Sequence, residues 1–131
     1  MPHVLIEGTI DLSALVDRLS PQTERVADVV RRTRNTFFNR LESTILIETK
    51  TVEAGITRNF FVRVDRKRGG AMVRIEPMTA VDRTTGVIET VAWVAENVRA
   101  QIPDGRLGTT NIPPGAFPAS ATDTTEAEAG E

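Results

Sequence analysis

The sequence predicts an α+β fold, with one long amphipathic helix packed on an antiparallel sheet of about five or six strands and an extended C-terminal arm. Residues 20–42 place apolar side chains at helical spacing. Residues 44–92 contain runs rich in β-branched residues, separated by turn signals. After residue 102 the apolar runs end, and four of the seven prolines lie there. We therefore expect one domain over residues 1–102 and an extended Pro/Gly/Thr-rich arm with an acidic end over residues 103–131.

The long helix is expected to begin at Ser20-Pro21, because serine at the N-cap with proline at the first helical position is a helix start signal. We expect it to continue to about Glu42. Its apolar stripe consists of Val26, Val29, Val30, Phe37, Phe38 and Leu41. Arginine-rich polar residues occupy the opposite side, which predicts an amphipathic helix covering the sheet.

The strands are predicted from alternation and from β-branched residues. A strand over residues 3–10 precedes a short helix over residues 11–19. Further strands are expected over residues 44–52, 59–65 and 71–76, with a glycine-containing hairpin between the last two. Hot-dog and helix-grip folds share the order of a strand, a long helix and then antiparallel strands, so both are candidate arrangements.

The segment Val87–Gln101 fits two patterns. Its valines lie on one helical face, but they also fit a buried strand. The hairpin loop expected before it favours a strand at the start, and Pro103 beyond it favours a helix at the end. We expect a strand to about Ala92.

Composition excludes several kinds of chemistry. The chain has no cysteine, which excludes disulfides, thiolate nucleophiles and cysteine-ligated metals. His3 is the only histidine, which argues against a histidine metal site or a Ser-His-Asp triad. We expect no cofactor and no metal. No signal peptide or membrane span is recognisable, so we expect a cytoplasmic protein or a component of an intracellularly assembled particle.

Positive charge is concentrated in the middle of the chain. Residues 18–83 contain 14 Lys and Arg against 8 Asp and Glu. The candidate binding residues are those around the predicted basic hairpin: Arg63, Arg66, Lys67, Arg68 and Arg74. Such a hairpin can bind an anion or a nucleic acid. The alternative is a solvated tip whose charges protect a sheet edge.

The arm carries three apolar anchors, Leu107, Ile112 and Phe117. Prolines around them favour an extended conformation, which predicts docking on a neighbouring subunit. The final segment Thr122–Glu131 is acidic and complements the basic body. The alternative is a terminus without a fixed position.

The opening residues MPHVLIE resemble the start of the 5-carboxymethyl-2-hydroxymuconate isomerases of the tautomerase superfamily. The resemblance implies that Pro2, once Met1 is removed, acts as a general base through its secondary amine. In that family the N-terminal proline heads a strand followed by a helix. The long helix and the hairpins of residues 63–87 depart from that arrangement. A second candidate is a proton-relay pair of His3 and Glu7 on one strand face.

These observations favour a non-enzymatic structural or interaction subunit of a homo- or hetero-oligomeric assembly, such as a virion component, that docks through its arm. The partners expected are further copies of the chain or a larger protein assembly. Two alternatives stay open: an isomerase using Pro2, and an anion or nucleic-acid binder using the basic hairpin.

Overall fold

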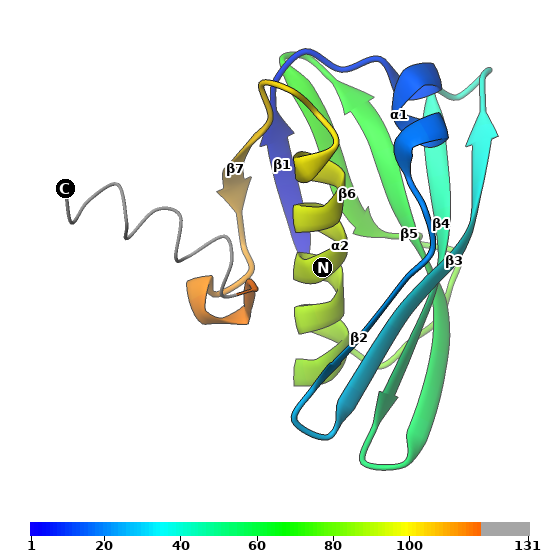
Figure 1. Cartoon of the computed structure of the whole chain (residues 1–131), viewed down its shortest axis with the longest axis vertical. Helices are drawn as coiled ribbons and strands as arrows, with labels where there is room; N and C mark the ends of the chain where they lie inside the picture. The colour runs from blue at the N-terminus through cyan, green and yellow to red at the C-terminus, as the bar shows by residue number, and fades with distance from the viewer. Residues whose placement is uncertain (119–131) are drawn as a thin grey trace, which may run out of the picture.

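The protein is built around a curled antiparallel sheet of seven strands in the order β2-β3-β4-β5-β6-β1-β7 (Figure 1). A computed structural model describes residues 1–118. The strands are β1 (His3–Glu7), β2 (Gln22–Val26), β3 (Val29–Asn39), β4 (Thr44–Glu53), β5 (Ile56–Lys67), β6 (Gly70–Ile75) and β7 (Arg106–Thr110). The helices are α1 (Leu12–Arg18), α2 (Thr85–Ala100) and the short 3-10 helix η1 (Pro114–Ala116). α2 lies within the curve of the sheet (Figure 1).

The predicted helix over residues 20–42 is wrong, because this segment forms the β2–β3 hairpin. Its turn is the dipeptide Ala27-Asp28, with Ala27 at φ 55°. β3 pairs with β4 through nine residue pairs. The valines, threonines and phenylalanines of this segment suit a pleated strand, and pairing with β4 outweighs the helical spacing that they also satisfy. The prediction of one long helix on five or six strands is corrected, within residues 1–118, to two α-helices and seven strands.

The expected strand from Val87 to Ala92 is also wrong, because these residues belong to α2. The hydroxyl of Thr84 accepts the N–H of Val87 at 3.2 Å and caps the helix. Val87, Val91, Val94 and Val98 then recur at intervals of three or four residues and are all buried. Burying this helical stripe in the curve of the sheet decides between the two periodicities.

Five further elements agree with the sequence-based predictions, whereas β7 and η1 lie in the segment expected to be an extended arm. β1, α1, β4, β5 and β6 lie within two or three residues of the expected bounds. The predicted glycine-containing hairpin joins β5 to β6 through Arg68-Gly69, where Gly69 adopts φ 79°. Antiparallel pairing and the mixture of helix and strand are confirmed.

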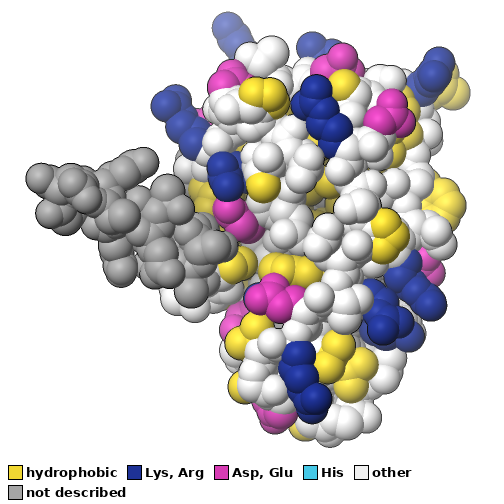
Figure 2. All heavy atoms as spheres, in the orientation of Figure 1, with side chains coloured by type: hydrophobic (Ala, Val, Ile, Leu, Met, Phe, Trp, Pro, Cys, Tyr) yellow, Lys and Arg dark blue, Asp and Glu magenta, His cyan; other side chains and the backbone are white. Residues whose placement is uncertain are grey.

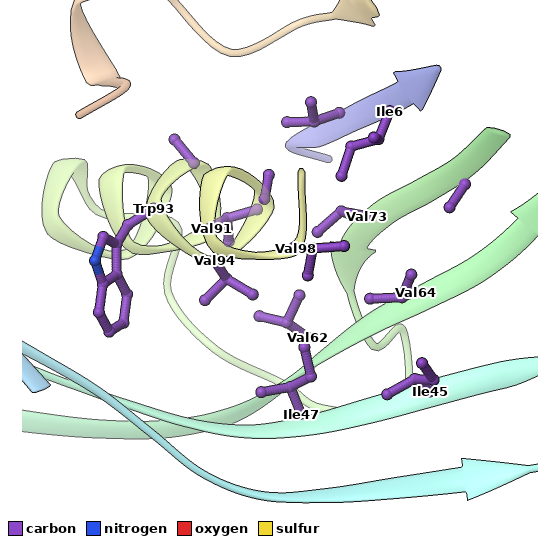
Figure 3. Packing of buried hydrophobic residues seen from close by; sticks show 14 of the residues in the cluster. Ile6, Ile45, Ile47, Val62, Val64, Val73, Val91, Trp93, Val94 and Val98 are labelled. Atoms are coloured by element: carbon purple, nitrogen blue, oxygen red, sulfur yellow. The ribbon is translucent and has the colours of Figure 1, made fainter. Parts of the chain in front are cut away.

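The core lies between α2 and the concave face of the sheet. Val91, Val94 and Val98 point from α2 toward the inward side chains of the sheet (Figure 3). The labelled strand residues opposite them are Ile6, Ile45, Ile47, Val62, Val64 and Val73. Leu12 and Leu15 of α1 belong to the same cluster. Both helices therefore pack against one face of the sheet and leave the other without a covering layer in residues 1–118.

Candidate functional site

The uncovered side of strands β3–β6 is called the convex face here. Alternation along β5 buries Phe60, Val62 and Val64 on the concave side and directs the intervening side chains to the convex face. Both helices contribute to the core on the concave side. Sheets whose second face meets water normally carry polar residues there, so apolar side chains on this face require an explanation.

An aromatic pair lies on the convex face. Phe37 of β3 and Phe61 of β5 meet edge to face, with ring centroids 6.2 Å apart and an interplanar angle of 63°. Leu46 belongs to β4, the strand between β3 and β5, and pairs with Phe37 in the β3–β4 ladder. The side chain of Phe37 is 52% exposed, although phenylalanine normally lies in a core. These three residues form an apolar patch.

A network of charged side chains lies beside the apolar patch. Arg63 Nε donates to Asp65 Oδ1 at 2.7 Å, and its Nη1 donates to Glu76 Oε2 at 3.0 Å. The Thr44 hydroxyl donates to the same Asp65 oxygen at 2.7 Å. Arg74 Nε lies 3.4 Å from Asp65 Oδ2. The side chains of Asp65 and Glu76 are only 10% and 13% exposed, so these ion pairs are well shielded from water.

The network holds Asp65 in its charged form. Burial by itself raises the pKa of Asp65, but hydrogen bonds from Thr44 and Arg63 and the charges of Arg63 and Arg74 outweigh it, and the pKa lies below its usual range. The hydrogen bond to Asp65 likewise raises the pKa of Arg63, against the opposing effect of burial. Arg63 and Asp65 therefore form a charged pair at neutral pH.

The structure separates the predicted basic residues into two groups. Arg63 and Arg74 lie in the network and are paired with acids. Arg66, Lys67 and Arg68 lie at the β5–β6 tip and are exposed. Basic and acidic side chains are interspersed on the face that Figure 2 shows. Nucleic-acid binding thus stays a prediction for three tip residues, and its test is a steep loss of affinity with salt.

The arm anchors are covered within their own chain. Ile112 is 3% exposed and belongs to the core cluster, while Leu107 and Phe117 pack partly buried against it. β7 pairs with β1, and η1 contacts α2. These contacts bury Ile112 within its own chain, and docking of the arm on a neighbour stays a prediction. The acidic segment Thr122–Glu131 lies outside the described residues.

Pro2 is buried just before β1. Met1, which precedes it, lines a pocket of about 580 Å³ between residues 57–59 of β5 and residues 76–83. Arg58 and Arg83 also line this space, which is called the edge pocket here. If Met1 were absent, the amine of Pro2 would adjoin this pocket. The arrangement has the two components that a proline base would need, a cavity and cationic side chains.

The proposed pair of His3 and Glu7 has other partners. His3 Nδ1 lies 3.1 Å from the carbonyl oxygen of Met1. Glu7 Oε1 accepts from Arg106 Nε at 2.8 Å. Within residues 1–118, no three acidic or histidine side chains come together as metal ligands. No helix there has the length and apolar character needed to cross a membrane.

The sequence reasoning missed the aromatic pair because it placed Phe37 on a helix. Alternation in residues 29–39 was the available signal: Arg31 and Thr33 point inward, and Phe37 points outward beyond an irregularity in the ladder. Even with this signal, the burial of an arginine at position 31 would not have been predicted. Arg31 is 5% exposed, pairs with Glu24 at 3.1 Å and stacks over Trp93 at 5.2 Å.

Comparison with known proteins gives no relatives. No protein-family model, no curated protein and no solved structure matches the chain. Function therefore has to be argued from the residues themselves.

Proposed function

We propose that this chain is a non-enzymatic interaction subunit that assembles with further copies of itself through the convex face. The observation that carries the proposal is the half-exposed Phe37 in its edge-to-face pair with Phe61. Aromatic residues surrounded by polar ones are typical of protein interfaces. We therefore propose the sheet as the docking surface, because Ile112 of the arm is already buried within its own chain.

Charge balance favours a second copy as the partner. The convex face and its rim carry charges of both signs: the cations Arg32, Lys50, Arg63, Lys67 and Arg74, and the anions Glu42, Glu48, Asp65 and Glu76. A face of mixed sign repels its own copy little, and a two-fold axis can place unlike groups opposite each other. A strongly charged partner would gain little from such a face.

The area approaches that of a typical stable contact. Four strands about 4.8 Å apart and the ten residues of β4 at about 3.4 Å each give a face of roughly 19 by 34 Å. That is on the order of 600 Å² before side-chain relief is added, against about 800 Å² per partner in typical stable complexes.

The test is the mass of the full-length particle in solution by sedimentation or light scattering. The wild type is expected to be a dimer or larger, and Phe37→Glu is expected to be a monomer with an unchanged circular dichroism spectrum. Val26→Glu is the matched control, because Val26 is 43% exposed on β2, outside the strands β3–β6 that form the convex face. A monomeric wild type at the highest soluble concentration would refute the proposal.

A second candidate is an isomerase that uses Pro2 as its base. It is favoured by the position of Met1 at the edge pocket, together with Arg58 and Arg83. Mass spectrometry would first establish whether Pro2 is the terminal residue. The wild type should then turn over keto–enol substrates, and Pro2→Ala should abolish this activity. Full activity in the variant excludes the candidate.

A further inference from the structure

The edge of β5 is open at its beginning. β5 starts at Ile56, but its ladder with β6 starts only at Val62. The carbonyl of Phe61 accepts the N–H of Glu76 at 2.8 Å, so the backbone groups of Phe61 point toward β6. Backbone direction alternates along a strand, and therefore Thr57 and Asn59 point to the same side. Within residues 1–118 no hydrogen bond reaches their N–H or C=O groups from that side.

This open edge forms one wall of the edge pocket. The segment 76–83 forms the opposite wall, and Ile75 and Val81 add apolar surface. The pocket volume of about 580 Å³ is in the range of ligand sites. A row of unpaired backbone groups next to an open space is a template for an added strand.

The guanidinium group of Arg58 lies at the same place and has N–H donors without an acceptor. Its side chain is 17% exposed, and its closest carboxylates are Glu53 at 3.6 Å and Asp82 at 3.8 Å. Both distances exceed a hydrogen bond, so its five N–H groups have no hydrogen-bond acceptor among the described residues.

The neighbouring acids are largely committed elsewhere. Glu53 accepts from Thr84 and from the N–H of Gly86. Glu76 accepts from Arg63. Exposed Arg83 adds a positive charge at the pocket, next to exposed Asp82. The lining thus carries two cations and two acids, and what Arg58 lacks is a hydrogen-bond acceptor rather than a counter-charge.

We propose that the edge pocket binds an extended acidic peptide of a partner protein, which adds a strand beside β5. Main-chain groups of the peptide hydrogen-bond to Thr57 and Asn59. An acidic side chain of the peptide meets Arg58 and Arg83, and alternate apolar side chains contact Ile75 and Val81. This site is separate from the convex face and does not depend on self-association.

The test uses full-length protein and two labelled six-residue peptides, capped at both ends, of alternating valine and glutamate or of alternating valine and lysine. Fluorescence anisotropy should show binding of the glutamate peptide only. Asn59→Pro removes the outward N–H, which an edge position tolerates, and should weaken binding at least about tenfold. Asn59→Ala keeps that N–H and should bind like the wild type. Arg58→Gln should reduce the preference for glutamate over lysine.

A measurement without any substitution keeps the proposal falsifiable if a variant misfolds. Bound peptide should slow hydrogen exchange of the Thr57 and Asn59 amides in the wild type. Unchanged exchange at both amides, or equal binding of the two peptides, overturns the proposal. The glutamate peptide is also titrated into a chain that ends at Pro118. If this shorter chain binds the peptide much more tightly than the full chain does, the occupant of the site is the chain's own end. That result would also overturn the partner proposal.

Discussion

Glu53 at the end of β4 accepts a hydrogen bond from the Thr84 hydroxyl at 2.6 Å. The same carboxylate accepts the N–H of Gly86 at 3.0 Å. Thr84 in turn caps α2 through the N–H of Val87. One carboxylate therefore fixes the start of α2 against the end of the β4 strand and places negative charge at the positive end of the helix dipole.

Replacing Glu53 with alanine should lower the free energy of unfolding by about 1.5–3 kcal/mol, the usual contribution of hydrogen bonds to a charged group. The change removes an acceptor from Thr84 and from Gly86. Urea denaturation followed by circular dichroism measures it. Asp17→Ala, on an exposed position of α1, is the control and should stay within about 0.5 kcal/mol.

The effect of Gly86→Ala on the free energy of unfolding should change sign between the wild type and the Glu53→Ala variant. A methyl group at Gly86 would lie 2.6 Å from the Glu53 carboxyl carbon, so the substitution displaces that carboxylate in the wild type and destabilises the protein by about 1 kcal/mol. In the Glu53→Ala background the obstacle is gone, and better helix propensity should stabilise by up to about 1 kcal/mol. A double-mutant cycle in urea decides; additive effects would contradict the geometry.

Gly70→Ala should be strongly destabilising. An added methyl group would lie 1.9 Å from the carbonyl oxygen of Ile6, in a backbone that cannot move without opening the β1–β6 ladder. We expect a loss of about 3 kcal/mol, at the upper end of overpacking effects. Thermal unfolding measures it against Gly115→Ala, where the new methyl group meets nothing within 4 Å. Equal melting temperatures would show that this contact is not formed.

Stability should fall when the pH drops below the ordinary pKa of aspartate, near 3.8. The folded protein depresses the pKa of Asp65, so its contribution is complete above the unfolded value and is lost as pH falls through the lower folded value. Asp104, whose pKa is lowered by hydrogen bonds from Thr9, acts in the same direction. Asp65→Asn should therefore be less stable at neutral pH and show a shallower acid dependence in urea titrations between about pH 5 and pH 2. A parallel profile would contradict this assignment.

Ile112→Ala distinguishes packing of the arm within its own chain from docking of the arm on a neighbouring subunit. Because Ile112 is 3% exposed within its own chain, truncation should cost about 2–5 kcal/mol in chemical denaturation. The particle mass should stay unchanged. Leu41→Ala, at a 97% exposed position, is the control and should be nearly neutral. A smaller particle with unaltered stability would instead support docking of the anchor on a neighbour.

The strands of residues 44–75 could be predicted because their alternation matches their environment: Val62 and Val64 face the core, while Phe61 and Arg63 face outward. Residues 22–39 could not, since Arg31 and Thr33 are inward-facing polar residues that interrupt the period of two. The burial of Arg31 depends on Glu24 of β2 and on Trp93 of α2, which lie on other elements. Helical spacing then appeared to be the better description.

The candidate sites were less accessible from sequence. Arg63 and Arg74 were chosen as binding residues for their charge, but Asp65 and Glu76 neutralise them across neighbouring strands. Which acid opposes which arginine depends on register, and register is a property of the assembled sheet. The open edge at Asn59 likewise follows from β6 being shorter than β5.

The pairing of Val4 with Thr110 has a consequence for the rate of folding. β1 can take its place between β6 and β7 only after more than half of the chain has been synthesised, because Val4 also pairs with Val73. Contacts of such wide sequence separation must overcome loop-closure entropy before they stabilise anything, which makes folding slow for the length of the chain. A newly made β1 thus has both of its edges unsatisfied during synthesis, and its interval of exposure is set by how quickly residues 70–110 follow.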